Sequence, residues 1–394
     1  MAGGVPWPTL MKILQFPSIT SISIDANSMW MGVPPPPPSA LLPNHCRLAH
    51  FSYTPKRWRG VENNLVGNDL QVTYALESSF LLALVLNMSG TAESLSLPVE
   101  TTPLLQMAAI EWPRLHTLSL TGQYMDLEQP RMLSLLLSRA PNLRTLSVRV
   151  AQRDGTSRPL LLKEPLESGF RVRSLTVAYP DPADVIFASL TDELTSLSLR
   201  DSPRYYLHQR HGWRTPLAIA PLLSSSECLT ILKRLSAPHL STLELAYRAD
   251  GAEDELLRYL PHAFPLLSEL ELHRYKAAES DDIPYMHIAH VLKGVKLLRT
   301  LHLNFDASLI QINDPWDQCP VWLNTSEHIH QRGSDLVAVL DAGERFERLA
   351  LLIHTRRGGM WVVFRPAWSP GLRIEYSSND RLDAPAPVMP YLDA

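Results

Sequence analysis

The stretch PNLRTLSVRV, residues 141–150, shows the pattern that decides the fold. Leu143, Leu146 and Val148 stand at the spacing apolar-x-x-apolar-x-apolar. Because successive side chains of a β-strand point to opposite faces, Leu146 and Val148 share one face and Ser147 lies on the other. We therefore predict a short strand with one apolar and one polar face.

The same six-residue pattern, called a half-line below, recurs along the chain, for example as ITSISI, LSTLEL and LRTLHL. Most neighbouring copies begin about 22 to 31 residues apart, close to the period of about 20–29 residues of leucine-rich repeats. The first apolar residue of each copy, called its anchor below, is Ile19, Leu48, Ala92, Leu115, Leu143, Val172, Leu194, Leu240, Leu267, Leu298 or Phe346. This recurrence predicts parallel strands stacked one per repeat.

Three gaps between anchors are nearly twice as long as the others: residues 48–92, 194–240 and 298–346. Each gap is expected to contain one degraded repeat or an insertion. Regular leucine-rich repeats have a ladder of asparagines after the strands, and this sequence has none. We therefore expect uneven units.

The segments between the strands carry helical patterns. In residues 129–139, the spacing of Met132, Leu135 and Leu136 predicts one helix face. Similar patterns occur at 253–260, 284–292 and 334–340. A proline, which disfavours helix in the residue before it, precedes several strands: Pro17, Pro113, Pro141, Pro238 and Pro265.

These patterns predict an α/β leucine-rich-repeat solenoid with parallel concave strands, outer helices and irregular repeats. We expect about 11–14 repeats over residues 17–355, after a short helix or partial cap at 1–16. Arg357-Gly358-Gly359 between two apolar runs predicts a hairpin cap over 356–376. Residues 377–394 are polar and proline-containing, which predicts a disordered tail.

Composition excludes several classes of protein. The chain has 394 residues, 45% of them hydrophobic, and a net charge of −4, so it can bury a core and gives no case for nucleic-acid binding. Three widely spaced cysteines indicate a reducing compartment. Neither a secretory signal nor an apolar run of membrane-spanning length is evident, so we expect a cytoplasmic or nuclear protein with no membrane partner.

The polar side chains of the strands define the candidate binding face, since solenoids commonly bind through their concave surface. Parallel strands lie about 4.8 Å apart, so Glu244, Glu271 and His302 are predicted to form a row across three neighbouring strands. The candidate partner-binding residues are Arg149, Arg200, Glu244, Glu269, Glu271, His273, His302 and Asn304. We expect a basic or polar protein partner here, and the alternative is a solvated face with no single role.

No enzyme or cofactor motif is present. The sequence lacks a phosphate loop, G-x-G-x-x-G after a strand, G-x-S-x-G and H-E-x-x-H, so we expect no catalysis and no cofactor. Glu271, His273 and His302 are residue types that bind metals, but we do not predict a metal site, because nothing in the sequence fixes the geometry that metal ligands require.

Three further segments have a functional and a structural interpretation. Residues 34–38 are five prolines, which suit either a polyproline ligand or a stiff loop. Residues 208–214, HQRHGWR, join cations to aromatics as single-stranded nucleic-acid binders do, but a surface insertion is favoured. Residues 313–322 contain two tryptophans that are expected to pack an insertion down.

The lines PNLRTLSV, LTSLSLRD, APHLSTLELAY and KLLRTLHLNF resemble the leucine-rich-repeat region of fungal F-box proteins. The resemblance covers roughly residues 15–360. It implies a non-enzymatic module that recruits substrates to a ubiquitin ligase, in which an N-terminal F-box docks on a Skp-type adaptor. No F-box is found here, so an adaptor is expected only if one lies upstream. The alternative is a stand-alone repeat scaffold or inhibitor.

Two substitutions test the assignment of strand faces. Leu146→Asp should unfold or aggregate the chain, because a buried unpaired carboxylate costs several kcal/mol. Glu271 is expected to face solvent, so Glu271→Ala should change stability by less than about 0.5 kcal/mol.

Overall fold

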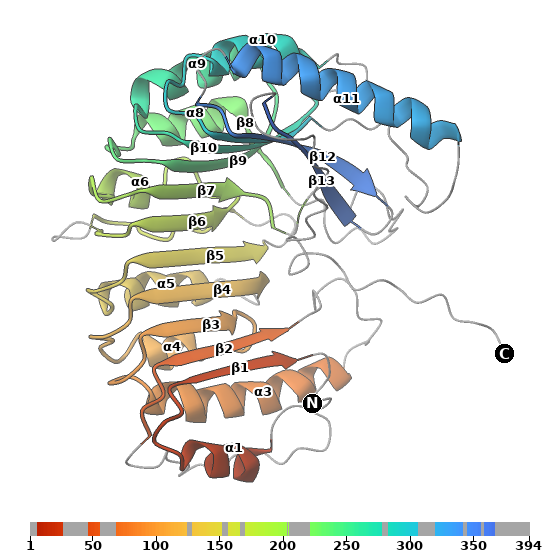
Figure 1. Ribbon diagram of the computed structural model, residues 1–394. Coiled ribbons are helices and arrows are strands. Elements are labelled where there is room, and N and C mark those ends of the chain that lie inside the picture. The colour runs from red at the N-terminus through yellow and green to blue at the C-terminus, as the bar shows by residue number, and fades with distance from the viewer. Residues whose placement is uncertain are drawn as a thin grey trace. The chain divides into compact units, whose positions relative to one another are not determined.

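The structure is a computed structural model that divides into two compact units, Met1–Ser189 and Leu190–Ala394. Each unit is described by itself. Both combine helices with a mostly parallel, open β-sheet (Figure 1). The described residues are 6–26, 46–55, 68–123, 128–151, 157–165, 170–202, 204, 221–277, 283–305, 320–341, 345–355 and 358–366.

In the first unit, six strands pair in parallel and in chain order. They are β1 (Ser21–Ala26), β2 (His50–Pro55), β3 (Ser94–Pro98), β4 (Thr117–Gln123), β5 (Thr145–Ala151) and β6 (Ser174–Ala178). The helices of this unit are α1 (Trp7–Leu14), α3 (Asn68–Asn87), α4 (Leu104–Met107), α5 (Glu128–Ser138) and α6 (Ile186–Ser189). The predicted N-terminal helix is thus confirmed as α1, which buries Trp7, Leu10 and Leu14.

In the second unit, the sheet order is β7-β9-β10-β11-β12-β13, and the short β8 pairs with the end of β9. The strands are β7 (Ser196–Arg200), β8 (Leu223–Ser224), β9 (Thr242–Arg248), β10 (Glu269–Tyr275), β11 (Thr300–Asn304), β12 (Arg348–Thr355) and β13 (Gly358–Phe364). The helices are α8 (Ser225–Lys233), α9 (Glu253–Ala263), α10 (Tyr285–Leu292) and α11 (Pro320–Leu340).

Each of the eleven predicted half-lines forms a strand, and each strand begins two residues after its anchor. The leucines of neighbouring half-lines stand in register, as Leu118, Leu146 and Leu175 do in the first unit. These leucines are fully or almost fully buried. In the second unit, Gly333 of α11 lies against the ring of Phe364, which is in register with Leu349. The leucine face is therefore the face that α11 covers.

The three long gaps contain insertions between strands that remain direct neighbours. Across these gaps β2 pairs with β3, β7 with β9, and β11 with β12. The inserted material includes the long helices α3 and α11. From the sequence, each long gap could contain either an insertion or a degraded repeat. The direct pairing of the flanking strands favours an insertion.

Two other predictions had different outcomes. The hairpin itself is confirmed, since β12 and β13 pair antiparallel from Leu349–Phe364 to Thr355–Gly358. It begins earlier than residue 356, and residues 367–376 of the predicted cap lie outside the described residues. The predicted face of α5 is wrong in part: Leu136 is buried as expected, but Leu135 is 48% exposed, and Leu133 and Leu137 are buried instead. The proline run, HQRHGWR, residues 313–319 and the tail 377–394 lie outside the described residues.

Candidate functional site

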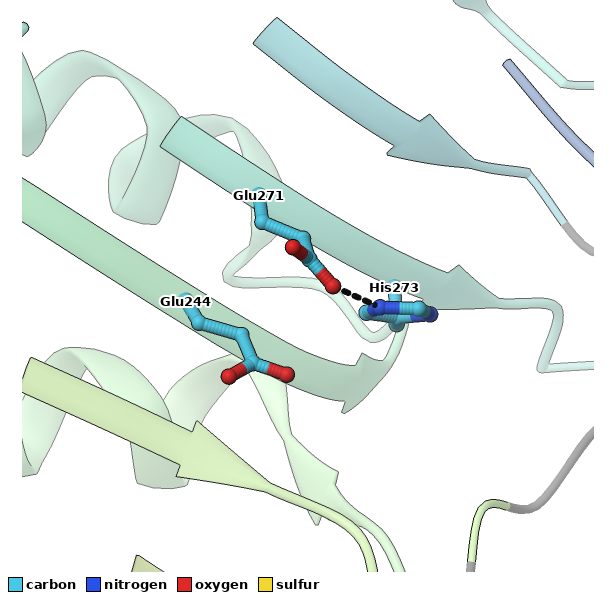
Figure 2. A group of neighbouring side chains, drawn as sticks. All are labelled: Glu244, Glu271 and His273. Atoms are coloured by element: carbon cyan, nitrogen blue, oxygen red, sulfur yellow. Dashed lines mark hydrogen bonds and ion pairs between the residues drawn. The ribbon is translucent and has the colours of Figure 1, made fainter. Parts of the chain in front are cut away.

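The candidate site lies in the second unit, on the face of the sheet opposite the leucines, called the polar face below. Glu271 on β10 is in register with Glu244 on β9 and with His302 on β11. The predicted row across three strands is therefore confirmed. Figure 2 shows Glu244 and Glu271 on adjacent strands, with His273 hydrogen-bonded to Glu271.

Arg204 joins the carboxylates of this face. Its Nη2 donates to Glu244 Oε1 at 2.5 Å and lies 3.5 Å from Glu271 Oε1, and its Nη1 donates to Asp201 Oδ1 at 2.9 Å. The Arg204 side chain is 2% exposed and that of Asp201 is fully buried. Because buried charges are costly unless paired, this arrangement is a neutralising network rather than a surface contact.

Two histidines and a serine complete the polar contacts. His273 Nε2 lies 2.6 Å from Glu271 Oε1, and His302 Nδ1 lies 3.4 Å from Glu271 Oε2. Ser198 Oγ donates to Glu244 Oε2 at 2.5 Å. Every oxygen of the two glutamates therefore has a partner within the protein.

An aromatic side chain from the C-terminal hairpin closes one end of the site. The Trp361 ring lies 5.0 Å from the His302 ring and 5.8 Å from the His273 ring, centroid to centroid. Trp361 belongs to a second apolar cluster with Tyr275, Leu352 and their neighbours. The polar face is consequently covered near the carboxyl ends of its strands.

The network keeps both glutamates ionised. Burial raises the pKa of the Glu271 carboxyl, but hydrogen bonds from His273 and His302 and the charge of Arg204 outweigh it and lower that pKa well below the ordinary value. For Glu244, burial is likewise opposed by Arg204 and Arg200, and its pKa is lowered. The row therefore carries negative charge at neutral pH that is largely compensated from within.

Three of these residues have the spacing of metal ligands. Glu244, Glu271 and His273 each offer one ligand atom, and the three atoms lie within 4.8 Å of one another. Arg204 already donates to Glu244 and lies close to Glu271. Since a guanidinium keeps its charge, a cation would have to displace it, and the geometry favours a salt-bridge network.

The remaining candidate residues are spread over both units. Arg149 lies on β5 in the first unit, Arg200 ends β7, and Glu269 is exposed at the start of β10. His273 and Asn304 are 0% and 1% exposed, so the expectation that they face solvent is wrong. The premise for Glu271→Ala is also wrong, because the Glu271 side chain is only 28% exposed and bonded on both oxygens.

The role of Arg204, four residues before the HQRHGWR segment, was not predicted from the sequence. Asp201 and Arg204 directly follow β7. A useful signal was available: two glutamates predicted side by side on neighbouring strands require a cation, and Arg204 comes soon after the strand that precedes them. The role of Trp361 had no comparable signal.

Comparison with known proteins gives no assignment: no protein-family model matches the chain, and no curated protein matches it significantly. Of the helices in the described part of the chain, none has both the length and the apolar character needed to cross a membrane.

The lowered pKa values predict how stability depends on pH. Glu271 binds a proton more weakly in the folded chain than in the unfolded chain, so its contribution is complete above the ordinary value of 4.5 and is lost as pH falls through the folded value. We expect the free energy of unfolding of Glu271→Gln to fall less steeply below pH 4.5 than that of the wild type. Urea titrations at several pH values measure both slopes, and equal slopes would contradict the assignment.

Proposed function

We propose that this chain is a non-enzymatic protein-recognition module of the leucine-rich-repeat type, similar to the substrate-binding region of an F-box ubiquitin-ligase receptor. The observation that carries the proposal is the polar face of the second unit. It presents a preformed row of charged side chains in register on adjacent parallel strands. Such faces are where repeat proteins commonly bind.

The accessible part of this face defines where a partner would bind. The front row, at the start of the strands, consists of Ser196, Thr242, Glu269, Thr300 and Arg348 in register. All five are exposed or partly exposed. The next row contains Glu244, Glu271 and His302, which are 15%, 28% and 24% exposed at the side chain. A partner therefore contacts the front row and reaches the edge of the second.

The chemistry of these rows favours recognition over catalysis. Both glutamates are held by Arg204 and by hydrogen-bond donors, so neither is poised as a proton acceptor. The front row combines a carboxylate, a guanidinium and hydroxyls. These groups suit a partner segment with polar and basic side chains.

Glu269→Arg tests this proposal. Tagged wild type and variant are compared in cross-linking pull-downs, and a partner of the polar face should be lost from the variant. Glu255→Arg is the matched control, because Glu255 is exposed on α9 and forms an ion pair with the exposed Lys233, away from the polar face. Loss of no partner, or equal loss in both variants, would overturn the proposal. A purified Skp-type adaptor in the same assay separates a ligase receptor from a stand-alone repeat protein.

A further inference from the structure

A second feature lies on the helical side of the second unit, where α9 and α10 lie side by side (Figure 1). Residues of these two helices and of the segment after α10 line a groove. It encloses about 620 Å³, within the range of small-molecule sites. Its nitrogen-bearing lining residues are Arg258, His262, His287, His290 and Lys296. No acidic residue is among the described residues that line it.

The close approach of the two helices forms the floor of the groove. Gly294 follows α10, and a Cβ at this position would lie 3.3 Å from Cγ of Pro261 in α9. The glycine therefore allows the end of α10 to lie directly against α9. The basic side chains that line the groove surround this contact between α9 and α10.

One carboxylate outside the lining orients two of the basic groups. Asp254 Oδ2 accepts a hydrogen bond from Arg258 Nε at 2.7 Å, and Asp254 Oδ1 lies 2.7 Å from His287 Nε2. The hydrogen bonds from Arg258 and His287 lower the pKa of Asp254. Arg258 contributes only its Nε to this pair, so its terminal amino groups remain as donors. This is the arrangement of an oriented guanidinium.

The other basic groups are not explained as helix caps. The carbonyls of Ala289, Val291 and Leu292 at the end of α10 already accept backbone N–H groups of residues 293–295. Within the described chain, the side chains of His262, His290 and Lys296 have no hydrogen bond or ion pair. Cations favour helix C-termini in general, but here the terminal carbonyls do not engage these side chains.

We propose that this groove binds a phosphate monoester. The terminal amino groups of Arg258, which Asp254 leaves free, and the ammonium of Lys296 can donate to the phosphate oxygens, and the ring N–H groups of His262 and His290 add donors. The volume leaves room for the group that carries the phosphate. A metal ion fits less well, since the three histidines do not bring their ligand atoms within the 4.8 Å spacing that the polar-face group meets.

Fluorescence anisotropy with the full chain tests the proposal. The probes are a labelled phosphoserine peptide and the same peptide with serine, and adenosine monophosphate is the competitor. We expect the phosphopeptide to bind and the serine peptide not to bind. Since a hydrogen bond to a charged group contributes about 1.5–3 kcal/mol, Arg258→Gln and Lys296→Gln should each weaken binding about tenfold or more.

Lys233→Gln is the control, because Lys233 is an exposed lysine on α8 paired with Glu255 outside the groove. Its affinity should equal that of the wild type. If adenosine monophosphate competes with the phosphopeptide, the ligand is indicated to be a small molecule. If it does not compete, the ligand is indicated to be a phosphorylated protein. Either result supports binding of a phosphate monoester. Equal binding of the two peptides, no binding, or equal losses in Lys233→Gln and Lys296→Gln would overturn the proposal. Thermal melts of these exposed-site variants check folding.

Discussion

Leu146→Asp is expected to leave the first unit unfolded at room temperature. Leu146 is fully buried on β5, in register with Leu118 and Leu175 on both neighbouring strands. The change removes about 1.5–3 kcal/mol of apolar burial, and an unpaired carboxylate among leucines costs several kcal/mol more. Together these costs are comparable with the whole stability of a typical domain, about 5–15 kcal/mol. Circular dichroism and a thermal melt measure the loss.

Ser147→Asp is the matched control, because it places the same carboxylate one residue later on the opposite face. Ser147 is partly exposed, between Ser119 and Thr176 in register. Water can solvate the charge there, so the free energy of unfolding should change by about 1 kcal/mol or less. If both variants lost the same stability, the assignment of faces would be wrong.

The strands could be predicted because their signal is local. Alternation within five residues decides which face is apolar, and the anchor two residues earlier fixes where each strand begins. The register of Glu244, Glu271 and His302 followed, because the half-lines align on their leucines. Helix faces were less certain: in α5, adjacent leucines at 135, 136 and 137 allow two neighbouring faces, and packing selects the second.

The burial of the polar face could not be predicted from the same signal. A polar residue that alternates with leucine was expected to face water, yet His273 and Asn304 are buried. Groups that pack on this face come from distant parts of the sequence: Arg204 after β7 lies beside Glu271, and Trp361 in β13 lies beside His273. Such long-range contacts leave no periodic pattern in the sequence.

Arg204→Met is expected to cost about 3–5 kcal/mol of unfolding free energy, the range for removing one partner of a buried ion pair. Methionine keeps most of the length of the side chain but no charge. Asp201 would remain fully buried without its ion pair to Arg204, and Glu244 would lose its closest charged partner while keeping the hydroxyl of Ser198 and the charge of Arg200. Chemical denaturation measures the loss. Arg299→Met is the control, since Arg299 is 64% exposed and pairs with the exposed Glu347, which predicts a loss of under about 1 kcal/mol.

A double variant separates charge neutralisation from packing. If Arg204 stabilises the fold by neutralising Glu244, then Glu244→Gln should recover part of the loss in Arg204→Met while destabilising the wild type. If Arg204 only fills space, the two effects should add. Additive effects, or equal losses of stability in Arg204→Met and Arg299→Met, would show that charge neutralisation by Arg204 does not stabilise the polar face. A non-additive result would mean that the glutamates are fixed by the fold before any partner arrives, so that binding need not spend free energy on ordering them.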